Sequence, residues 1–246
     1  MPNNMTALIT GGTRGIGKAI VYTLAQKGYN IAFVYNKSTK EAHEIEQSIQ
    51  KMCVKCTSYA LDLSETVQIP DLVSKIIKDF GKIDVLVNNA GVCFDKELCD
   101  RTVSLFEKTM KVNVLAAFEL TKLVGQHMKN NKYGKVVNIS SDNAISSFYP
   151  TTIDYDCSKA ALNVLTKDFA IEFAPYVNVN AIAPGWVDTD MNKNVLTDDI
   201  KELESKRILK GRIGTPQDIA NLVSFLVSAE AEYINGEVIV INGGMF

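Results

Sequence analysis

The sequence predicts an α/β protein with a doubly wound parallel sheet, and three observations lead to this fold class. Short runs of apolar and β-branched residues alternate with amphipathic stretches along the whole chain of 246 residues. The short runs are continuously apolar, as in strands that helices cover on both faces of a sheet. No linker, repeat or low-complexity block interrupts the alternation, so we expect a single domain over residues 1–246.

Seven segments are candidates for strands, and helical patterns fill the intervals between them. In chain order the candidates are 7–9, 31–35, 57–61, 85–87, 136–139, 177–182 and 238–241. Strands that alternate with helices join by right-handed crossovers into a parallel sheet. Such sheets bind ligands outside the carboxyl ends of their strands, so residues that directly follow a strand are the first candidates for a site.

The first strand candidate leads into a glycine-rich turn. Residues 7–9 are followed by TGGTRGIG at 10–17 and then by a helical pattern. Glycines let the backbone approach a phosphate closely, and the start of a helix offers free N–H groups and the positive end of its dipole. The spacing differs from the standard Gly-x-Gly-x-x-Gly fingerprint. A phosphate cradle is therefore our interpretation, and a plain glycine turn stays open at this point.

A tyrosine and a lysine lie four residues apart in a later helical segment. Tyr155 and Lys159 share one face of that helix, because residues at this spacing are stacked one turn apart. A phenol with a pKa of about 10 becomes a useful acid near neutral pH when a positive charge stabilises its phenolate. The pair alone is also compatible with an ordinary surface contact.

Composition excludes several classes of function. The chain carries 26 basic and 28 acidic side chains, a net charge of −2, which argues against general attraction to nucleic acid or to anionic membranes. The start of the chain lacks a basic signal segment, and no apolar run approaches the ~20 residues that span a bilayer. We therefore expect a soluble, cytoplasmic protein.

Five cysteines, an odd number, indicate free thiols rather than a disulfide framework. Cys53 and Cys56 form a Cys-x-x-Cys pair without a second pair, and the two histidines, His43 and His127, lie far from it in sequence. A redox or zinc role is the alternative. We predict instead a connection between a helix and a strand there, and no metal site.

Taken together, the motifs resemble the short-chain dehydrogenase/reductase family over almost the whole chain. They are TGGTRGIG at 10–17, NNAG at 88–91, Asn113 within KVNV at 111–114, NISS at 138–141, Tyr155 with Lys159, and NAIAPG at 180–185 followed by Val187 and Thr189. The tail, with GRIGTP at 211–216 and YING at 233–236, is most similar to the 3-oxoacyl-acyl-carrier-protein reductases. The resemblance implies a Rossmann-type fold, with a cofactor half of about residues 1–140 and a catalytic and substrate half of about 141–246.

The resemblance also implies the catalytic roles. Tyr155 would be the general acid that protonates the carbonyl oxygen as hydride reaches the carbon. Ser141 would hydrogen-bond that oxygen. Lys159 would lower the pKa of Tyr155 and bind the nicotinamide ribose, and Asn113, in a long helix, would hold a water that completes a proton relay.

The cofactor-binding positions follow from the same motifs. The resemblance assigns the adenine contact to Asp62 and the carboxamide contacts to Val187 and Thr189. The full set that it implies is Gly11, Thr13, Arg14, Gly15, Ile16, Gly17, Asn36, Lys37, Ser38, Asp62, Leu63, Asn89, Ala90, Gly91, Tyr155, Lys159, Pro184, Gly185, Val187 and Thr189.

The end of the second strand predicts the choice of cofactor. NAD enzymes place a carboxylate there to bind the 2′-hydroxyl of the adenosine ribose. This chain reads Val34-Tyr35-Asn36-Lys37-Ser38, without an acid. Arg14 and Lys37 offer two cations to a 2′-phosphate, so we predict NADPH/NADP; the alternative is that both are solvated surface cations.

One spacing departs from the family pattern. Ser141 and Tyr155 are fourteen positions apart, where the family usually has thirteen, which would formally move the serine role to Asp142. A carboxylate cannot donate the required hydrogen bond. We therefore keep Ser141 and expect one extra residue in the loop 146–153, beside the substrate.

The substrate is less well defined. We predict reduction of 3-oxoacyl thioesters, with acyl carrier protein as a partner that Lys129, Lys132 and Lys135 would attract. Those lysines equally suit a helix C-terminus, and 173–177 lacks the arginine of that branch. The alternatives are an NADPH-linked reductase of a steroid, sugar or small ketone, and a non-catalytic dinucleotide-binding protein. The resemblance also suggests a homotetramer built through helices in 105–128 and 160–174.

Overall fold

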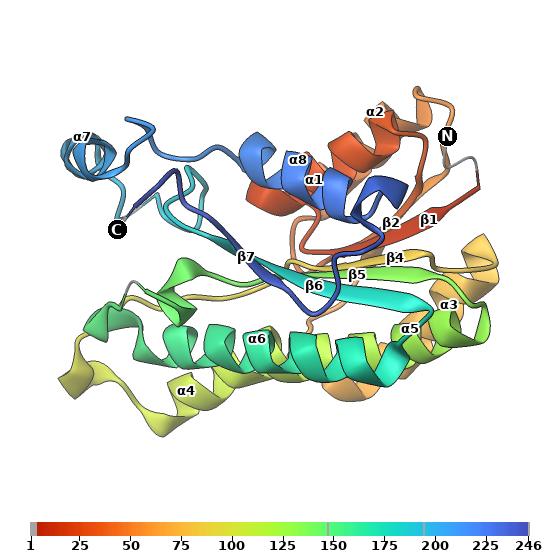
Figure 1. The fold of residues 1–246 in the computed structure, drawn as a ribbon, viewed down its shortest axis with the longest axis horizontal. Helices are drawn as coiled ribbons and strands as arrows, with labels where there is room; N and C mark the ends of the chain where they lie inside the picture. The colour runs from red at the N-terminus through yellow and green to blue at the C-terminus, as the bar shows by residue number, and fades with distance from the viewer. Residues whose placement is uncertain (1–3, 147, 194, 246) are drawn as a thin grey trace.

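The computed structural model describes residues 4–146, 148–193 and 195–245, and within them seven strands form one parallel sheet (Figure 1). The strands are β1 Thr6–Thr10, β2 Asn30–Tyr35, β3 Cys56–Ala60, β4 Val85–Asn88, β5 Gly134–Ile139, β6 Val177–Pro184 and β7 Val238–Ile241. All seven predicted strands are confirmed, and every boundary lies within two residues of its predicted place. The spatial order is β3-β2-β1-β4-β5-β6-β7.

Eight α-helices connect and flank the strands in the described part of the chain. They are α1 Gly15–Gln26, α2 Thr39–Gln50, α3 Ile69–Phe80, α4 Val103–Met110, α5 Ala116–Asn130, α6 Ile153–Phe173, α7 Asp198–Arg207 and α8 Pro216–Leu226. Figure 1 shows α1, α2 and α8 on one face of the sheet and α3, α5 and α6 on the other, with α4 below α6. The doubly wound arrangement is therefore confirmed.

Apolar side chains on the two faces of the sheet form two cores. One contains Phe33 and Val87 with residues of α1, α2 and α8, and the other contains Leu8 and Leu86 with residues of α3, α5 and α6. All residues of β1, β4, β5 and β6 are buried. This two-sided burial explains the apolar runs of β1 and β4. The polar residues of β5 and β6, which are Lys135, Asn138, Asn178 and Asn180, are buried with hydrogen-bond partners.

The strand order reverses between β1 and β4, which are neighbours in the sheet although two strands separate them in sequence. Chains that leave such neighbouring strands diverge to opposite faces and leave a crevice at the carboxyl ends. The glycine turn follows β1, and the NNAG motif spans the end of β4. α7 lies beyond the same edge of the sheet in Figure 1. We call this edge the carboxyl edge.

The backbone conformation tests two local predictions, one for the segment 53–56 and one for Asn113. Cys53 lies in the turn after α2 and Cys56 opens β3, so the predicted helix-to-strand connection is confirmed. Asn113 does not lie in an uninterrupted α-helix, because a π-helical turn, Lys111–Leu115, separates α4 from α5. Such turns admit one extra residue per turn and turn a side chain to a different direction from that of a regular helix.

No helix among the described residues is both long and apolar enough to cross a membrane. Within those residues no cluster of three or more histidine, cysteine, aspartate or glutamate side chains could hold a metal ion.

Candidate active site

The glycine turn is held against the second strand by its own backbone. The amides of Gly11 and Gly12 both donate to the carbonyl of Val34, at 2.8 and 3.2 Å. Helix α1 then starts so close to the turn that a Cβ on Gly17 would lie 2.1 Å from the carbonyl oxygen of Gly11. Only glycine fits position 17, since the colliding atom belongs to the backbone and cannot rotate away.

The start of α1 has open hydrogen-bond donors. Arg14 occupies the N-cap in an extended conformation, and its side chain does not cap the helix. Among described residues, the N–H groups of Gly15, Ile16 and Gly17 have no acceptor. Together with the positive end of the helix dipole these donors suit a pyrophosphate. The turn therefore fits the phosphates of a dinucleotide.

The NNAG motif supports this turn through Thr10, which the sequence analysis did not single out. The hydroxyl of Thr10 accepts hydrogen bonds from the amides of Asn89, at 3.0 Å, and Ala90, at 2.9 Å. The side-chain amide of Asn89 donates to the carbonyl of Thr10 at 2.8 Å. The ends of β1 and β4 are thus joined, and the Asn89 side chain is committed to the turn. Its predicted place along the cofactor stays a prediction.

The residues predicted to contact the adenosine lie at the ends of β2 and β3. Asn36 donates to the carboxylate of Asp62 at 3.1 Å, so the two predicted positions are neighbours. Hydrogen bonds from Ser64 lower the pKa of Asp62.

Arg14 and Lys37 are both exposed and form no ion pair within the described chain. Their charges therefore remain available to an anion. Ser38 follows at the N-cap of α2, and Leu63 is buried.

The two hydroxyls predicted to be catalytic come from different elements. Ser141 follows β5 and is 7% exposed, and Tyr155 lies in the first turn of α6. Ser141 lies beside Tyr155, and its hydroxyl lowers the pKa of the phenol. Asp142 points elsewhere: its carboxylate faces Gly185 and Asn242. The geometry therefore places Ser141, and not its neighbour, at the tyrosine.

Lys159 is buried behind the tyrosine. It is 3% exposed, and its Nζ donates to the carbonyl of Ile139 at 2.7 Å. The same Nζ lies 5.4 Å from the centroid of the Tyr155 ring. Burial of the ammonium lowers the pKa of Lys159 from 10.5 to about 8. The group is therefore largely charged at neutral pH and able to exchange its proton.

The expected lowering of the Tyr155 pKa is wrong. Burial raises the pKa of Tyr155, the nearby thiol of Cys93 raises it further, and Ser141 only partly opposes them. The four-residue spacing indicates the charge of Lys159 but not the desolvation of the phenol, which disfavours the phenolate. The protein alone therefore keeps Tyr155 in its protonated form.

Asn113 joins the same group of residues. Its side chain forms a pair of hydrogen bonds with the backbone of Val92, donating to the carbonyl at 2.9 Å and accepting from the amide at 2.8 Å. It also donates to the hydroxyl of Ser158 at 2.9 Å. A Cβ on Gly91 would lie 3.4 Å from the Oδ1 of Asn113 and 3.5 Å from the Nζ of Lys159. The three predicted residues are thus neighbours.

A ladder of buried amides and hydroxyls lies behind these residues. Asn88 donates to Thr121 at 2.9 Å and to Asn138 at 2.8 Å, and Asn138 donates to Thr166 at 2.9 Å. The ladder joins β4 and β5 to α5 and α6. It therefore fixes the strand that carries Ser141 relative to the helix that carries Tyr155.

The segment after β6 completes the edge. Pro184 ends that strand, and Val187 forms an isolated bridge with Gly214. Thr189 lies beside the glycine turn, since its Cγ2 would be 3.4 Å from a Cβ on Gly15. The predicted carboxamide residues and the predicted phosphate residues therefore face one another across the carboxyl edge.

The structure also places Cys93 and Asp156, which the sequence did not indicate, at the site, and it brings Asp142 there without the role of Ser141. The charge of Cys93 in its thiolate form raises the pKa of both Tyr155 and Lys159. Burial raises the pKa of Cys93 itself to about 11. Asp142 is 3% exposed, and burial raises its pKa to about 6. Asp156 directly follows the tyrosine. Their positions next to predicted motifs were the only signal available in the sequence.

The lysine cluster does not form a docking patch, and this prediction is wrong. Lys135 is 2% exposed and bonds to Asn178 and Glu232. Lys129 pairs with Glu172 at 3.1 Å. The cluster lies at the amino end of β5, and Ser141 follows its carboxyl end, about 20 Å away at ~3.3 Å per residue. The sequence showed that the lysines were close together but not which edge of the sheet they occupy.

Comparison with known proteins agrees with this arrangement. A family model described as "Enoyl-(Acyl carrier protein) reductase" matches residues 11–246. The chain is 34% identical over 245 residues to a 3-oxoacyl-(acyl-carrier-protein) reductase of Staphylococcus epidermidis, covering 99% of both chains. It is 36% identical over 243 residues to an L-rhamnose 1-dehydrogenase (NADP(+)) of Thermoplasma acidophilum, covering 97% of this chain and 95% of that one.

A solved structure is similar over the same extent. A blue fluorescent protein from a metagenomic library, in complex with NADPH, superposes with a TM-score of 0.92 at 31% identity. The match covers 99% of this chain and 98% of the other.

Proposed function

The chain belongs to the short-chain dehydrogenase/reductase family, and we propose that it is an NADPH-dependent reductase of a ketone. The observation that carries this proposal is the convergence of Ser141, Tyr155, Lys159 and Asn113 at the carboxyl edge, next to an open helix N-terminus. A dinucleotide-binding protein without catalysis has no need of these four together. The family comparison supports the same oxidoreductase class.

The side chains divide the work of the reduction. Bound NADPH would supply the hydride. Tyr155, kept protonated by burial, gives its proton to the carbonyl oxygen, and Ser141 hydrogen-bonds and orients that oxygen. Lys159, with a pKa of about 8, holds a proton that can replace the one that Tyr155 loses. Asn113 holds the backbone of Val92 in place beside Lys159 through two hydrogen bonds. It thereby stabilises the surroundings through which a proton reaches Lys159.

Tyr155→Phe tests the proposal directly. The ring is kept and the transferable proton is removed, so ketone reduction falls by orders of magnitude while NADPH binding, measured by fluorescence titration, stays nearly intact. Ser141→Ala is similarly impaired, whereas Ser140→Ala is the matched control. More than about a tenth of the original rate in Tyr155→Phe, a loss below ~1.4 kcal/mol, would exclude Tyr155 as the acid.

The cofactor preference rests on Arg14 and Lys37. We expect kcat/KM with NADPH to exceed that with NADH by at least ~100-fold, as two cations on one phosphate supply a few kcal/mol. Replacing both by alanine removes most of this ratio. Lys51→Ala, an exposed lysine at the far end of α2, is the control. Equal use of both cofactors by the unchanged protein contradicts the assignment.

For the substrate, we propose a 3-oxoacyl thioester, with acyl carrier protein as its carrier, because the Staphylococcus relative carries that name. A sugar or small hydroxyketone is the second candidate, supported by the similar identity to the rhamnose dehydrogenase. NADPH oxidation with acetoacetyl-carrier protein, acetoacetyl-N-acetylcysteamine, 2,3-butanedione and L-rhamnono-lactone separates them. Equal rates with acetoacetyl-carrier protein and acetoacetyl-N-acetylcysteamine would exclude the carrier protein as a partner.

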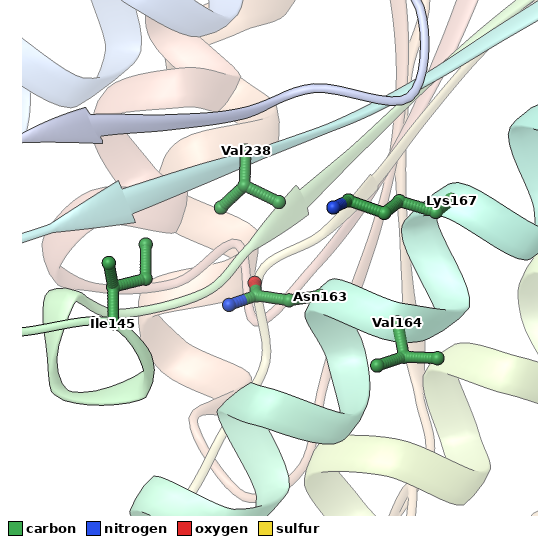
Figure 2. Close-up of a pocket in the computed structure, with 5 residues that line it drawn as sticks. All are labelled: Ile145, Asn163, Val164, Lys167 and Val238. Carbon is green, nitrogen blue, oxygen red and sulfur yellow. The ribbon is translucent and has the colours of Figure 1, made fainter.

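We also propose that the protein assembles as a homotetramer through α5 and α6. Phe118, Val164 and Ile171 are 38%, 58% and 78% exposed on these helices. Beside Val164, a hollow of about 210 Å³ lies between α6 and β7; Figure 2 shows it with Ile145, Asn163, Val164, Lys167 and Val238 around it. Light scattering on the intact protein and on Ile171→Glu measures the assembly, which the glutamate should weaken.

A further inference from the structure

We propose that Asp156 and Asn143 form a positioning pair that holds the loop between Ser141 and Tyr155 in place and thereby determines which ketones reach the two catalytic hydroxyls. The inference builds on the proposed ketone reduction and assigns its substrate selectivity to these residues. The loop, 142–152, overlaps the segment 146–153, in which the spacing predicts one extra residue, and it is described except for residue 147.

The carboxylate of Asp156 accepts three hydrogen bonds, and all three donors belong to this loop. They are the side-chain amide of Asn143 at 2.8 Å, the hydroxyl of Thr152 at 3.0 Å, and the backbone amide of Tyr149 at 3.4 Å. The donors come from the start, the end and an intermediate point of the loop. A single half-buried carboxylate next to Tyr155 thus fastens the loop along its length.

Asn143 connects the two catalytic residues. Its backbone amide donates to the hydroxyl of Ser141 at 3.3 Å, and its side-chain amide donates to Asp156, the neighbour of Tyr155. Charge-assisted hydrogen bonds to a carboxylate are stronger and shorter than neutral ones. The pair therefore holds the backbone that carries Ser141 at a set position relative to the helix that carries Tyr155.

The helix itself is anchored by the other aspartate beside Tyr155. Asp154 is fully buried, pairs with Arg101 and accepts a hydrogen bond from Thr109. Arg101 further bonds to the carbonyls of Phe94 and Lys96 at 3.0 and 3.2 Å. Arg101 also donates to the carbonyl of Thr151, near the end of the loop. Because this anchor holds only that end, loss of Asp156 should release the earlier part of the loop while Thr151 and the start of α6 stay in place.

The loop also reaches the opposite wall of the site. The ring of Tyr149 packs edge-on against Trp186, with centroids 5.9 Å apart and an interplanar angle of 62°. Trp186 follows β6 next to the residues predicted to face the cofactor. The position of the loop therefore sets the distance between the loop and the segment after β6. A substrate chain must pass between these two segments. A positional error of ~1 Å there is enough to change turnover substantially.

Asp156→Ala, Asn143→Ala and the double variant test this assignment, with Asp168→Ala as the control. Asp168 is an exposed aspartate on the same helix without a side-chain hydrogen bond among described residues. Two measurements are made on the intact protein. Hydrogen exchange follows the peptide 142–152, and kcat/KM is compared for acetoacetyl- and 3-oxooctanoyl-N-acetylcysteamine, with NADPH affinity measured in parallel.

We expect Asp156→Ala to speed exchange in the loop at least tenfold and to change the ratio of kcat/KM between the two thioesters at least fivefold. NADPH affinity stays within twofold, and exchange in α6 beyond residue 157 is unchanged. Asn143→Ala shifts both measurements in the same direction but by less, because it removes one of the three bonds to Asp156. The double variant is no worse than Asp156→Ala, because that change already removes the bond that the two residues share.

Three results overturn the inference: an unchanged exchange rate in the loop, an equal loss for both thioesters, or effects that multiply in the double variant. Asn143→Ala serves in place of Asp156→Ala if the latter does not fold. If the unchanged protein reduces neither thioester, the proposed substrate is wrong. The exchange measurement still decides whether the pair holds the loop.

Discussion

Lys159→Met removes a buried ammonium and keeps most of the side-chain volume, so it separates the catalytic value of this lysine from its cost to stability. Burial lowers the pKa of Lys159 from 10.5 to about 8. Each tenfold change in a protonation equilibrium corresponds to about 1.4 kcal/mol. Holding the ammonium in this site therefore costs the folded protein about 3 kcal/mol at neutral pH, relative to the unfolded chain.

The direction of the pH dependence follows from proton binding. Between pH 8 and 10.5 the unfolded chain binds a proton at Lys159 that the folded protein does not, so the free energy of unfolding rises with pH in this window. The penalty is complete below pH 8 and absent above 10.5. Lys159→Met lacks this titration. The stability of the unchanged protein, relative to the variant, should therefore increase by about 3 kcal/mol from pH 7.5 to pH 10.5.

Urea denaturation followed by the fluorescence of Trp186, the single tryptophan, measures this difference at several pH values. Groups that titrate alike in both proteins cancel in the comparison. The lost hydrogen bond to Ile139 shifts the variant by a similar amount at every pH and so leaves the slope unaffected. The variant should have no ketone reductase activity. A stability difference that is constant with pH, or that falls, would refute the assignment of a buried ammonium.

Three further predictions follow from the structure. Gly17→Ala should abolish NADPH binding in a fluorescence titration, because its methyl group would collide with the carbonyl of Gly11; unchanged affinity would show that the turn tolerates the shift. Asp142→Asn should stabilise the protein at pH 7 by up to about 3 kcal/mol and have little effect below pH 4. The pKa of Asp142 is raised from 3.8 to about 6, so the folded protein is destabilised relative to the unfolded chain as pH rises through this window. Urea denaturation at both pH values checks the sign. Arg101→Met should lower the free energy of unfolding by about 3–5 kcal/mol by leaving the carboxylate of Asp154 buried and unpaired, and additional replacement of Asp154 by alanine should restore most of the loss.

Much of the fold was predictable because its signals are local. Runs rich in apolar and β-branched residues identified all seven strands, since burial on both faces of a parallel sheet favours such residues. The turn at 10–17 was recognisable because backbone approach requires glycine at given places, and Gly17 is one of them. Some predicted strand boundaries differ from the observed ones by one or two residues, because the end of a strand depends on its neighbours in the sheet.

The candidate site was predictable only in part. Spacing along one helix was enough to pair Tyr155 with Lys159, and strand ends were enough to bring Ser141 to the same edge. The loop held by Asp156 was expected to be altered, but its three bonds to the carboxylate could not be read from spacing. Such contacts depend on the path of a loop that has no periodic pattern of its own.

By itself, the sequence determined the parallel sheet, the glycine turn and the order of the predicted catalytic residues, because each follows from periodicity or spacing over a few residues. Only the tertiary structure decided the protonation of Tyr155, the burial of Lys135 and the support of Asn89 by Thr10. Thr10 and Asn89 are 79 positions apart, and Lys135 and Glu232 are 97 apart. Desolvation and hydrogen bonding act through space between segments that are distant in the chain, so these properties exist only once the sheet has assembled.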